Sequence, residues 1–315
     1  MFLSKAIDGY ILEGLAGNYS PQTMRLYKIN LNRFLQYQGD CDLTTIKPEK
    51  LSEYMFYLRN EYKPNRISED TSPLSPSALD NHWKALRSFF RWCSEVLELQ
   101  RPDLHLPRQK FQLPEVIPFT EAEVKAIIHA CEYTKQSNTN NHRKPFAMRR
   151  PTAHRDKALV LLLLDTGLRV SEVTRLQIKD INLNNGEVHI IPYGSGQKTK
   201  PRTVYLGMVA RRSIWLYINE LNSPSENEPI FDLSTGNIRL LLYRMGERVN
   251  IKDVYPHRFR HTFAVQYLRN GGDVFTLQRI LGHSTLDMVR KYLTLADSDS
   301  ADAHRKASPA DRWRL

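Results

Sequence analysis

Apolar residues at helical spacing dominate the first hundred residues of this 315-residue chain. Ser20-Pro21 places an N-cap residue before a proline at the first helical position, and an apolar face runs from there to Leu35. Ser75-Pro76 repeats the start signal before a longer aromatic-rich face, and residues 51–58 form another amphipathic stretch. Aromatic side chains at this spacing are typical of a protein core. The pattern therefore predicts a helical domain over residues 1–108.

A proline-rich stretch then interrupts the helical pattern, and we predict an interdomain linker over residues 109–118. Thr120 and Glu123 form a capping box that opens the next helix. Residues 134–155 form a polar insertion with six basic residues, which is either a solvated loop or a flap over DNA. These six residues are Lys135, Arg143, Lys144, Arg149, Arg150 and Arg155.

The rest of the chain mixes helical and strand-like patterns. Residues 156–176 are helical in pattern, and two β-like runs follow at Glu187–Pro192 and Arg202–Leu206, joined by a basic, glycine-containing tip. Helical spacing resumes at about residues 237–249, 258–270, 275–281 and 284–292. We therefore predict a mainly α-helical protein with a small β-sheet, whose second domain is mixed α/β and covers residues 119–315 with a C-terminal tail.

The charge distribution favours the second domain as the partner of a polyanion. The net charge is +11, and residues 1–110 hold 15 Lys and Arg against 13 Asp and Glu, a net of +2. Residues 111–315 hold 30 against 21, a net of +9. Many basic proteins bind no nucleic acid, so the charge alone is weak evidence for DNA binding.

Several classes of protein are disfavoured. The longest apolar run, residues 158–164, is too short to span a bilayer, and the first residues lack the order of a secretory signal. Cys41, Cys93 and Cys131 lie far apart, without the spacing of a metal site or a disulfide framework. We expect a cytoplasmic protein with no membrane segment, no bound metal and no cofactor.

Four short segments of the second domain carry candidate chemistry. They are Thr166–Val173, the hairpin tip with Lys198, His257–Ala264, and Leu281-Gly282-His283, which is followed nine residues later by Tyr292. Taken singly, each segment has an ordinary structural explanation. One tyrosine among 15 is by itself a poor candidate for a nucleophile.

Together, the segments resemble the tyrosine recombinase or phage integrase family, and the helical first domain resembles that family's core-binding domain. The family's catalytic set runs Arg, Lys, His-x-x-Arg, His or Trp, and Tyr in chain order. This sequence supplies Arg169, Lys198, His257, Arg260, His283 and Tyr292 in the same order. The resemblance covers nearly the whole chain. It implies Xer-like, two-domain DNA strand transfer without metal or ATP.

The chemistry explains why these residue types are needed. Attack on a phosphodiester builds negative charge on oxygen, and Arg169 and Arg260 suit a clamp on that charge. His257 and His283 can donate hydrogen bonds or move protons near neutral pH. A cationic pocket should favour the phenolate of Tyr292, with His257 as a plausible base.

The resemblance also implies a lysine on the hairpin that protonates the departing 5′ oxygen. Ser195 stands where the commoner form of the turn has its lysine, so Lys198 is the candidate and Lys200 follows close behind. Glu172 lies three residues after Arg169, where it either orients that arginine or a histidine, or is a plain surface acid.

By resemblance, the chain is a site-specific recombinase, an integrase or resolvase that works through a 3′-phosphotyrosyl intermediate. Its expected partners are double-stranded DNA and three further copies of itself, with C-terminal segments docking on neighbours in a nucleoid-associated tetramer. The candidate DNA contacts are Arg143, Lys144, Arg149, Arg150 and Arg202. Two alternatives remain open: a type IB topoisomerase, which reseals the original strand, and a non-catalytic DNA-binding relative.

Overall fold

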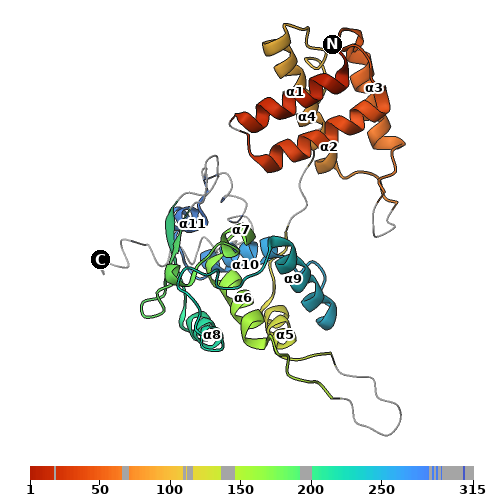
Figure 1. The fold of residues 1–315 in the computed structure, drawn as a ribbon. Helices are drawn as coiled ribbons and strands as arrows, with labels where there is room; N and C mark the ends of the chain where they lie inside the picture. Colours follow the sequence, from red (N-terminus) through yellow and green to blue (C-terminus); the bar gives the residue numbers. More distant parts are fainter. Residues whose placement is uncertain are drawn as a thin grey trace, which may run out of the picture. The chain divides into compact units, whose positions relative to one another are not determined.

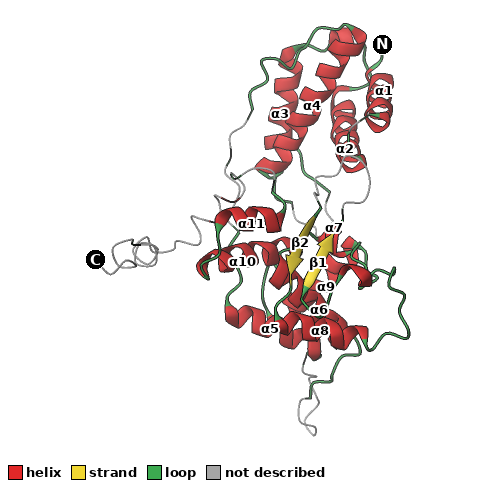
Figure 2. Ribbon diagram, turned by 90° about the vertical axis from the view of Figure 1, so that its left-hand side faces the viewer, coloured by secondary structure: helices red, strands yellow, loops and turns green. Residues whose placement is uncertain are grey.

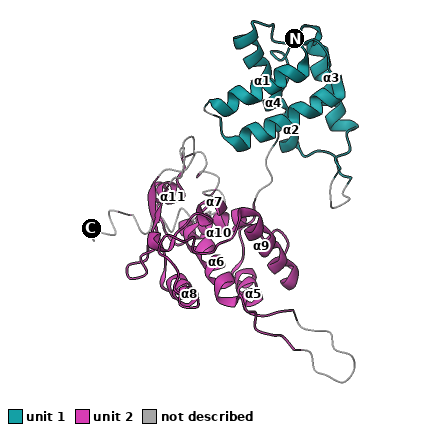
Figure 3. Cartoon of the chain, in the orientation of Figure 1, with its two compact units in different colours: residues 1–114, 194–197 teal, residues 115–193, 198–315 magenta. Residues whose placement is uncertain are grey.

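The chain forms two compact units (Figures 1 and 3). The computed structural model describes residues 1–17, 19–65, 71–108, 111, 116–135, 146–191, 201–283, 286, 289, 292 and 308. The described residues up to 111 belong to unit 1, and those from 116 onward belong to unit 2. The division falls after Pro114, inside the stretch 109–118, and the bounds of the linker itself stay a prediction.

Unit 1 is helical throughout its described elements, and two of these helices, α2 and α4, begin at the residues that the sequence marks. They are α1 (Leu3–Ala16), α2 (Pro21–Gln38), α3 (Pro48–Asn60) and α4 (Pro76–Leu97), with a 3₁₀ turn at Leu43–Thr45. The Ser20 hydroxyl accepts a hydrogen bond from the backbone N–H of Thr23, and that of Ser75 accepts one from Ala78. Both N-caps therefore act as predicted.

The segment after α4 packs onto unit 1. Trp83 Nε1 donates to the carbonyl of Leu106 at 3.0 Å, and the Leu106 side chain is buried. Asp103 is fully buried and forms ion pairs with Arg87 and Arg101. Because a buried carboxylate needs such partners, these pairs fix the backbone that leaves the helical unit.

Unit 2 surrounds a central helix. Its described elements are α5 (Glu121–Glu132), α6 (Ala153–Thr166), α7 (Val170–Val173), a 3₁₀ turn (Ile178–Asp180), β1 (Glu187–Ile190), β2 (Arg202–Tyr205), α8 (Met208–Ile218), α9 (Thr235–Val249), α10 (Pro256–Arg269) and α11 (Val274–Leu281). Helix α6 contacts α5, α8 and α10, so its apolar run is buried on all sides. The Thr120 capping box starts α5 as predicted.

The small sheet is an antiparallel pair beside the helices of unit 2 (Figure 2). Glu187 pairs with Tyr205 and Ile190 with Arg202, so the described strands are slightly shorter than the predicted runs. The hairpin tip, residues 192–200, lies outside the described residues. Among the described residues, no helix has the length and apolar character needed to cross a membrane.

Two sequence predictions about unit 2 need correction, and one helix was not predicted. The helix predicted over residues 156–176 ends at Thr166, because Gly167 takes a left-handed conformation with φ +61°. Helix α6 begins at Ala153, so the insertion after α5 is shorter than 134–155, and its residues 136–145 lie outside the described residues. Helix α8 was not anticipated, although its buried Ala210, Ile214 and Tyr217 have helical spacing. The predicted helix over 284–292 has only three described residues.

Candidate active site

The first turn of α10 is anchored to the beginning of unit 2 by Arg258. Its guanidinium donates to the carbonyls of Ile117 at 2.9 Å and Lys252 at 2.8 Å. The same group forms an ion pair with Glu123 at 3.1 Å and lies 3.9 Å from the centroid of the Phe119 ring. These contacts come from several directions, so the backbone that carries His257 and Arg260 is held in place.

Two left-handed glycines end the helices that border the site. Gly167 ends α6, and a Cβ built there would lie 2.5 Å from the Phe263 ring, so a side chain cannot be added without a shift. Its carbonyl accepts a hydrogen bond from Arg260 Nη1 at 2.8 Å. Gly282, with φ +64°, ends α11 and leaves the last carbonyls of that helix without helical partners.

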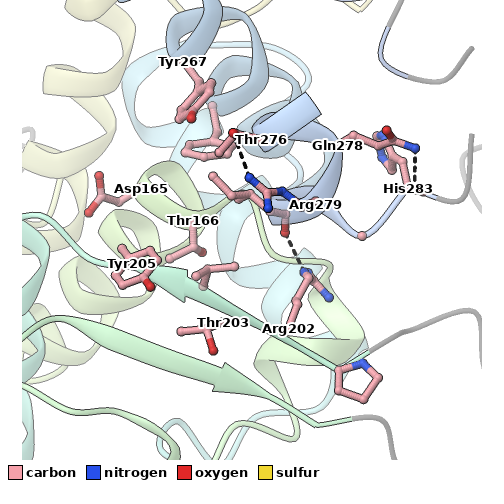
Figure 4. Close-up of a pocket in the computed structure, with 15 residues that line it drawn as sticks. Asp165, Thr166, Arg202, Thr203, Tyr205, Tyr267, Thr276, Gln278, Arg279 and His283 are labelled. Carbon is pink, nitrogen blue, oxygen red and sulfur yellow. Dashed lines mark hydrogen bonds between the residues drawn. The ribbon is translucent and has the colours of Figure 1, made fainter. Parts of the chain in front are cut away.

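Three arginines use these free carbonyls at the C-terminal end of α11. Arg260 Nη2 donates to the carbonyl of Leu281 at 2.7 Å, and Arg169 Nη1 approaches the same oxygen at 3.4 Å. Arg202 Nε reaches from β2 to the carbonyl of Ile280 at 2.6 Å (Figure 4). The negative end of the helix dipole attracts cations, so the helix terminus gathers the positive charge.

Glu172 is the carboxylate that holds two of these arginines. It accepts from Arg202 at 3.0 and 2.8 Å and from Arg169 Nη1 at 3.2 Å, and its side chain is 4% exposed. Burial by itself would raise the pKa of Glu172, but the hydrogen bonds and charges of Arg202 and Arg169 outweigh it and lower the pKa. Glu172 is thus a buried positioning group and not a plain surface acid.

The buried cluster keeps an excess of positive charge. Arg260 is 2% exposed, and burial together with the charge of Arg169 lowers its pKa to about 10. Even so, the guanidinium stays protonated at neutral pH. Glu172 is the carboxylate that pairs with Arg169 and Arg202, while Arg260 is held by carbonyls and an imidazole. An anion entering here would meet positive charge that the protein has not neutralised.

His283 is a neutral imidazole in contact with Arg260. Arg260 Nη2 donates to His283 Nε2 at 2.8 Å, so the neutral ring carries its proton on Nδ1. Burial and the charges of Arg260, Arg169 and Arg202 lower the pKa of His283 to about 3. Its Nδ1 is buried and has no hydrogen-bond partner among the described residues. The ring therefore offers a free N–H donor inside the site.

His257 also resists protonation, although its side chain keeps an exposed face. Neighbouring protein atoms that displace water lower its pKa, and the charges of Arg260 and Arg169 lower it further. A neutral imidazole can accept a proton, which a charged one cannot.

Tyr292 lies within this set of cations and imidazoles. The side chain is 3% exposed, and its ring lies 6.2 Å from that of His283 and 5.1 Å from that of His261. Burial raises the pKa of Tyr292, whereas Arg260 and Arg169 lower it and a hydrogen bond with Arg260 acts in the same direction. Burial prevails, so the expectation that the pocket favours the phenolate is wrong for the free protein. The phenol stays protonated until a base removes its proton.

A pocket of about 940 Å³ borders the site without containing Tyr292 (Figure 4). It lies over β2 and beside α10 and α11, and both Arg202 and His283 line it. The candidate catalytic residues therefore lie at the margin of this pocket, at the C-terminal end of α11.

The structure brings together Arg169, Arg260, His283 and Tyr292, with His257 one turn before His261 on α10. The supporting Glu172 joins them, and so does Arg202, which was predicted as a DNA contact. Arg150 lies elsewhere and pairs with Asp156 at 2.7 Å, while the exposed Arg149 contacts His154. The other predicted residues, Lys198, Lys200, Arg143 and Lys144, lie outside the described residues.

The sequence prediction missed His261. Its ring lies 4.4 Å from that of His257 and 5.1 Å from that of Tyr292. The available signal was its spacing, because residues four apart on a helix share a face. No group of three or more His, Cys, Asp or Glu that could hold a metal occurs in the described part of the chain.

The site combines a buried phenol with guanidinium groups and neutral imidazoles, and it lies on a helical unit with a small sheet. This arrangement defines a class of protein. It is the arrangement expected of a protein that transfers phosphodiester groups through a tyrosine.

Comparison with known proteins agrees with this class. Residues 118–299 match the phage integrase family, and residues 14–97 match the N-terminal SAM-like domain of phage integrases. The chain belongs to the phage integrase family.

Relatives that match over most of their length include the tyrosine recombinase XerA of Thermococcus kodakarensis, 29% identical over 91% of this chain and 90% of that protein. Tyrosine recombinase XerC of Staphylococcus epidermidis is 25% identical over 93% of each chain.

Two solved structures share the fold. The Tn1549 transposon integrase in complex with transposon right-end DNA has a TM-score of 0.71 and 17% identity, covering 97% of this chain and 99% of that one. A lambda integrase dimer bound to a core site has a TM-score of 0.66 and 17% identity, covering 91% and 97%.

Proposed function

We propose that this protein is a site-specific recombinase that cuts and rejoins double-stranded DNA through a 3′-phosphotyrosyl link to Tyr292. One observation carries the proposal. A buried phenol lies beside Arg260 and His283, in a cluster whose positive charge exceeds its negative charge. Family membership supports the reaction, and the geometry supports the roles that we propose for individual residues.

Arg169 and Arg260 grip the scissile phosphate. A guanidinium keeps its charge and offers paired donors to the oxygens on which negative charge develops. His283 adds its free Nδ1–H as a further donor. Arg202 and Glu172 hold this set in position and do not touch the phosphate, because both are engaged with each other.

The cleavage step exchanges one oxygen on phosphorus for another. The Tyr292 hydroxyl oxygen bonds to phosphorus as the bond from phosphorus to the 5′ oxygen breaks. His257, neutral in the free protein, takes the phenol proton. Lys198 gives a proton to the departing 5′ oxygen, with Lys200 as the alternative donor. The reverse sequence, with a new 5′-hydroxyl as nucleophile, reseals DNA without ATP.

We propose DNA contact outside the reacting phosphate at three basic residues of the insertion and its edge. Arg149 is exposed beside the insertion, and Arg143 and Lys144 are carried within it. Arg150 and Arg202 are held by Asp156 and Glu172, so we do not assign them to DNA.

Strand exchange between two sites needs several protomers, and we propose a tetramer on synapsed DNA with exchange of C-terminal segments. A chromosomal or mobile-element substrate places the protein in the cytoplasm with the nucleoid.

The test uses duplexes enriched from a random-sequence library by binding to the Tyr292→Phe variant, rebuilt with a nick next to the cleavage position. Wild type should become covalently trapped on this DNA. Tyr292→Phe should bind equally well and form no adduct. Adduct formation that persists in Tyr292→Phe would refute the nucleophile.

The same assay separates the competing functions. A topoisomerase would relax supercoiled plasmid without joining two enriched sites, and a non-catalytic relative would bind the duplex without forming an adduct. Exchange of strands between two differently labelled duplexes is the outcome expected here.

A further inference from the structure

His261 is a ring in the site for which the proposed reaction has no role. It lies on α10 one turn after His257, and the centroids of the two imidazoles are 4.4 Å apart at an interplanar angle of 84°. The His261 ring also lies 5.1 Å from the Tyr292 ring, at an interplanar angle of 66°. His261 is therefore a neighbour of both the proposed base and the proposed nucleophile.

The phenol ring is constrained from two directions. His261 meets it in a T-shaped contact, and His283 lies nearly parallel to it, at 15° and a centroid distance of 6.2 Å. Edge-to-face and parallel contacts both restrict rotation of an aromatic ring, and in combination they fix the direction of its oxygen.

We propose that His261 is a positioning residue that holds the Tyr292 ring so that its oxygen faces the scissile phosphorus. The inference rests on the proposed function. In-line attack requires the oxygen to lie close to phosphorus and opposite the departing oxygen, and small displacements lower such rates steeply.

The role proposed for His261 is one of ring packing, and the T-shaped geometry with Tyr292 supports it. A T-shaped ring pair needs an aromatic ring at position 261 but no ring nitrogen. The position of His257 depends less on the His261 contact, because Arg258 anchors the turn that carries His257.

The first experiment compares His261→Phe with His261→Ala in single-turnover trapping on the nicked duplexes described above. His261→Phe keeps the ring and should stay within about threefold of wild type. His261→Ala releases the phenol and should slow adduct formation by about 10- to 100-fold, with DNA binding unchanged. If His261→Phe is as slow as His261→Ala, the ring nitrogens are required and the proposal is wrong. Equal rates for His261→Ala and wild type would also overturn it.

A second readout removes Tyr292 from the reaction. In the Tyr292→Phe background, a DNA strand with a 3′-(4-nitrophenyl) phosphate is supplied with a 5′-hydroxyl strand. The 5′-hydroxyl gives its proton to the hairpin lysine that donates it in cleavage, its oxygen bonds to phosphorus, the bond from phosphorus to the nitrophenyl oxygen breaks, and nitrophenolate leaves. Adding His261→Ala should leave this joining rate unchanged within about threefold. A general structural defect would slow joining as much as trapping, and that result would refute the positioning role.

His129 provides a matched control. It forms a histidine–tyrosine ring pair with Tyr133 at 5.0 Å on α5, away from the site. His129→Ala should trap DNA at the wild-type rate. Absence of trapping in wild type would refute the proposed function itself, whereas normal trapping in His261→Ala would refute only the inference.

Discussion

Each unit contains an arginine, a histidine and a tyrosine packed together, and the two clusters differ in how their hydrogen bonds are completed. In the unit 1 cluster, Arg33 Nη1 contacts His82 Nε2 at 3.1 Å, and the Tyr54 hydroxyl contacts His82 Nδ1 at 3.1 Å. Both ring nitrogens of this buried histidine therefore have partners. The cluster is complete as it stands.

The unit 2 cluster, Arg260, His283 and Tyr292, has the same residue types and a different outcome. Arg260 donates to His283 Nε2 at 2.8 Å, but Nδ1 has no partner among the described residues, and Tyr292 stacks on the ring. An unpaired buried donor is costly for folding alone. Open hydrogen bonds, and not residue types alone, therefore distinguish the candidate site from the structural cluster of unit 1.

The largest expected difference between the clusters concerns catalysis. Arg260→Ala should slow adduct formation by about 100- to 1000-fold, because a donor to the developing negative charge is lost. Arg33→Ala should leave the rate in bound complexes unchanged. Single-turnover trapping at saturating protein measures both. Loss of binding and cleavage in proportion, in Arg260→Ala, would contradict its role in the transition state.

A smaller effect is expected on stability. Tyr54→Phe leaves His82 Nδ1 without its partner and should lower the free energy of unfolding by about 1–3 kcal/mol, with trapping unaffected. Urea denaturation measures this, and Tyr37→Phe, at an exposed ring of the same unit, is the control. If the two variants are equally stable, the unit 1 cluster is not completed by Tyr54.

Acid should weaken each cluster by about 1 kcal/mol between pH 7.5 and 5.5. The pKa of His82 is lowered to about 4, by burial first and by Arg33 second, and that of His283 to about 3. Unfolded histidines take up protons near pH 6.5, so stability is full above that pH. Each histidine should remove about 1.4 kcal/mol per pH unit as the pH falls toward its folded pKa. Urea denaturation between pH 7.5 and 5.5 measures the slope.

Binding of DNA should raise the pKa of His283 and leave that of His82 unchanged. A bound phosphate favours the protonated form of His283 and leaves that of His82 unaffected. NMR titration of the ring protons, with and without an enriched duplex, should show a raised pKa for His283 and an unchanged pKa for His82. Equal behaviour of both histidines would contradict the placement of the phosphate beside His283.

Much of the fold was predictable because its signals are local. Ser20, Ser75 and Thr120 cap helices where the sequence places them. The break at Gly167 was missed, although glycine is the common residue for that conformation, because the apolar pattern continues beyond it. Helix α8 was missed for the opposite reason, since its exposed Met208 and Trp215 blur the apolar face.

The sequence by itself determined the order and type of the reacting groups, the helical start signals and the family resemblance. Only the tertiary structure decided that Glu172 pairs with Arg202, 30 residues away, that the pKa values of His257 and His283 are lowered, and that His261 contacts Tyr292. It also reversed the expected shift in the pKa of Tyr292. The physical reason is that burial and the distances between separate elements set pKa values and open hydrogen bonds, and neither quantity is a property of local sequence.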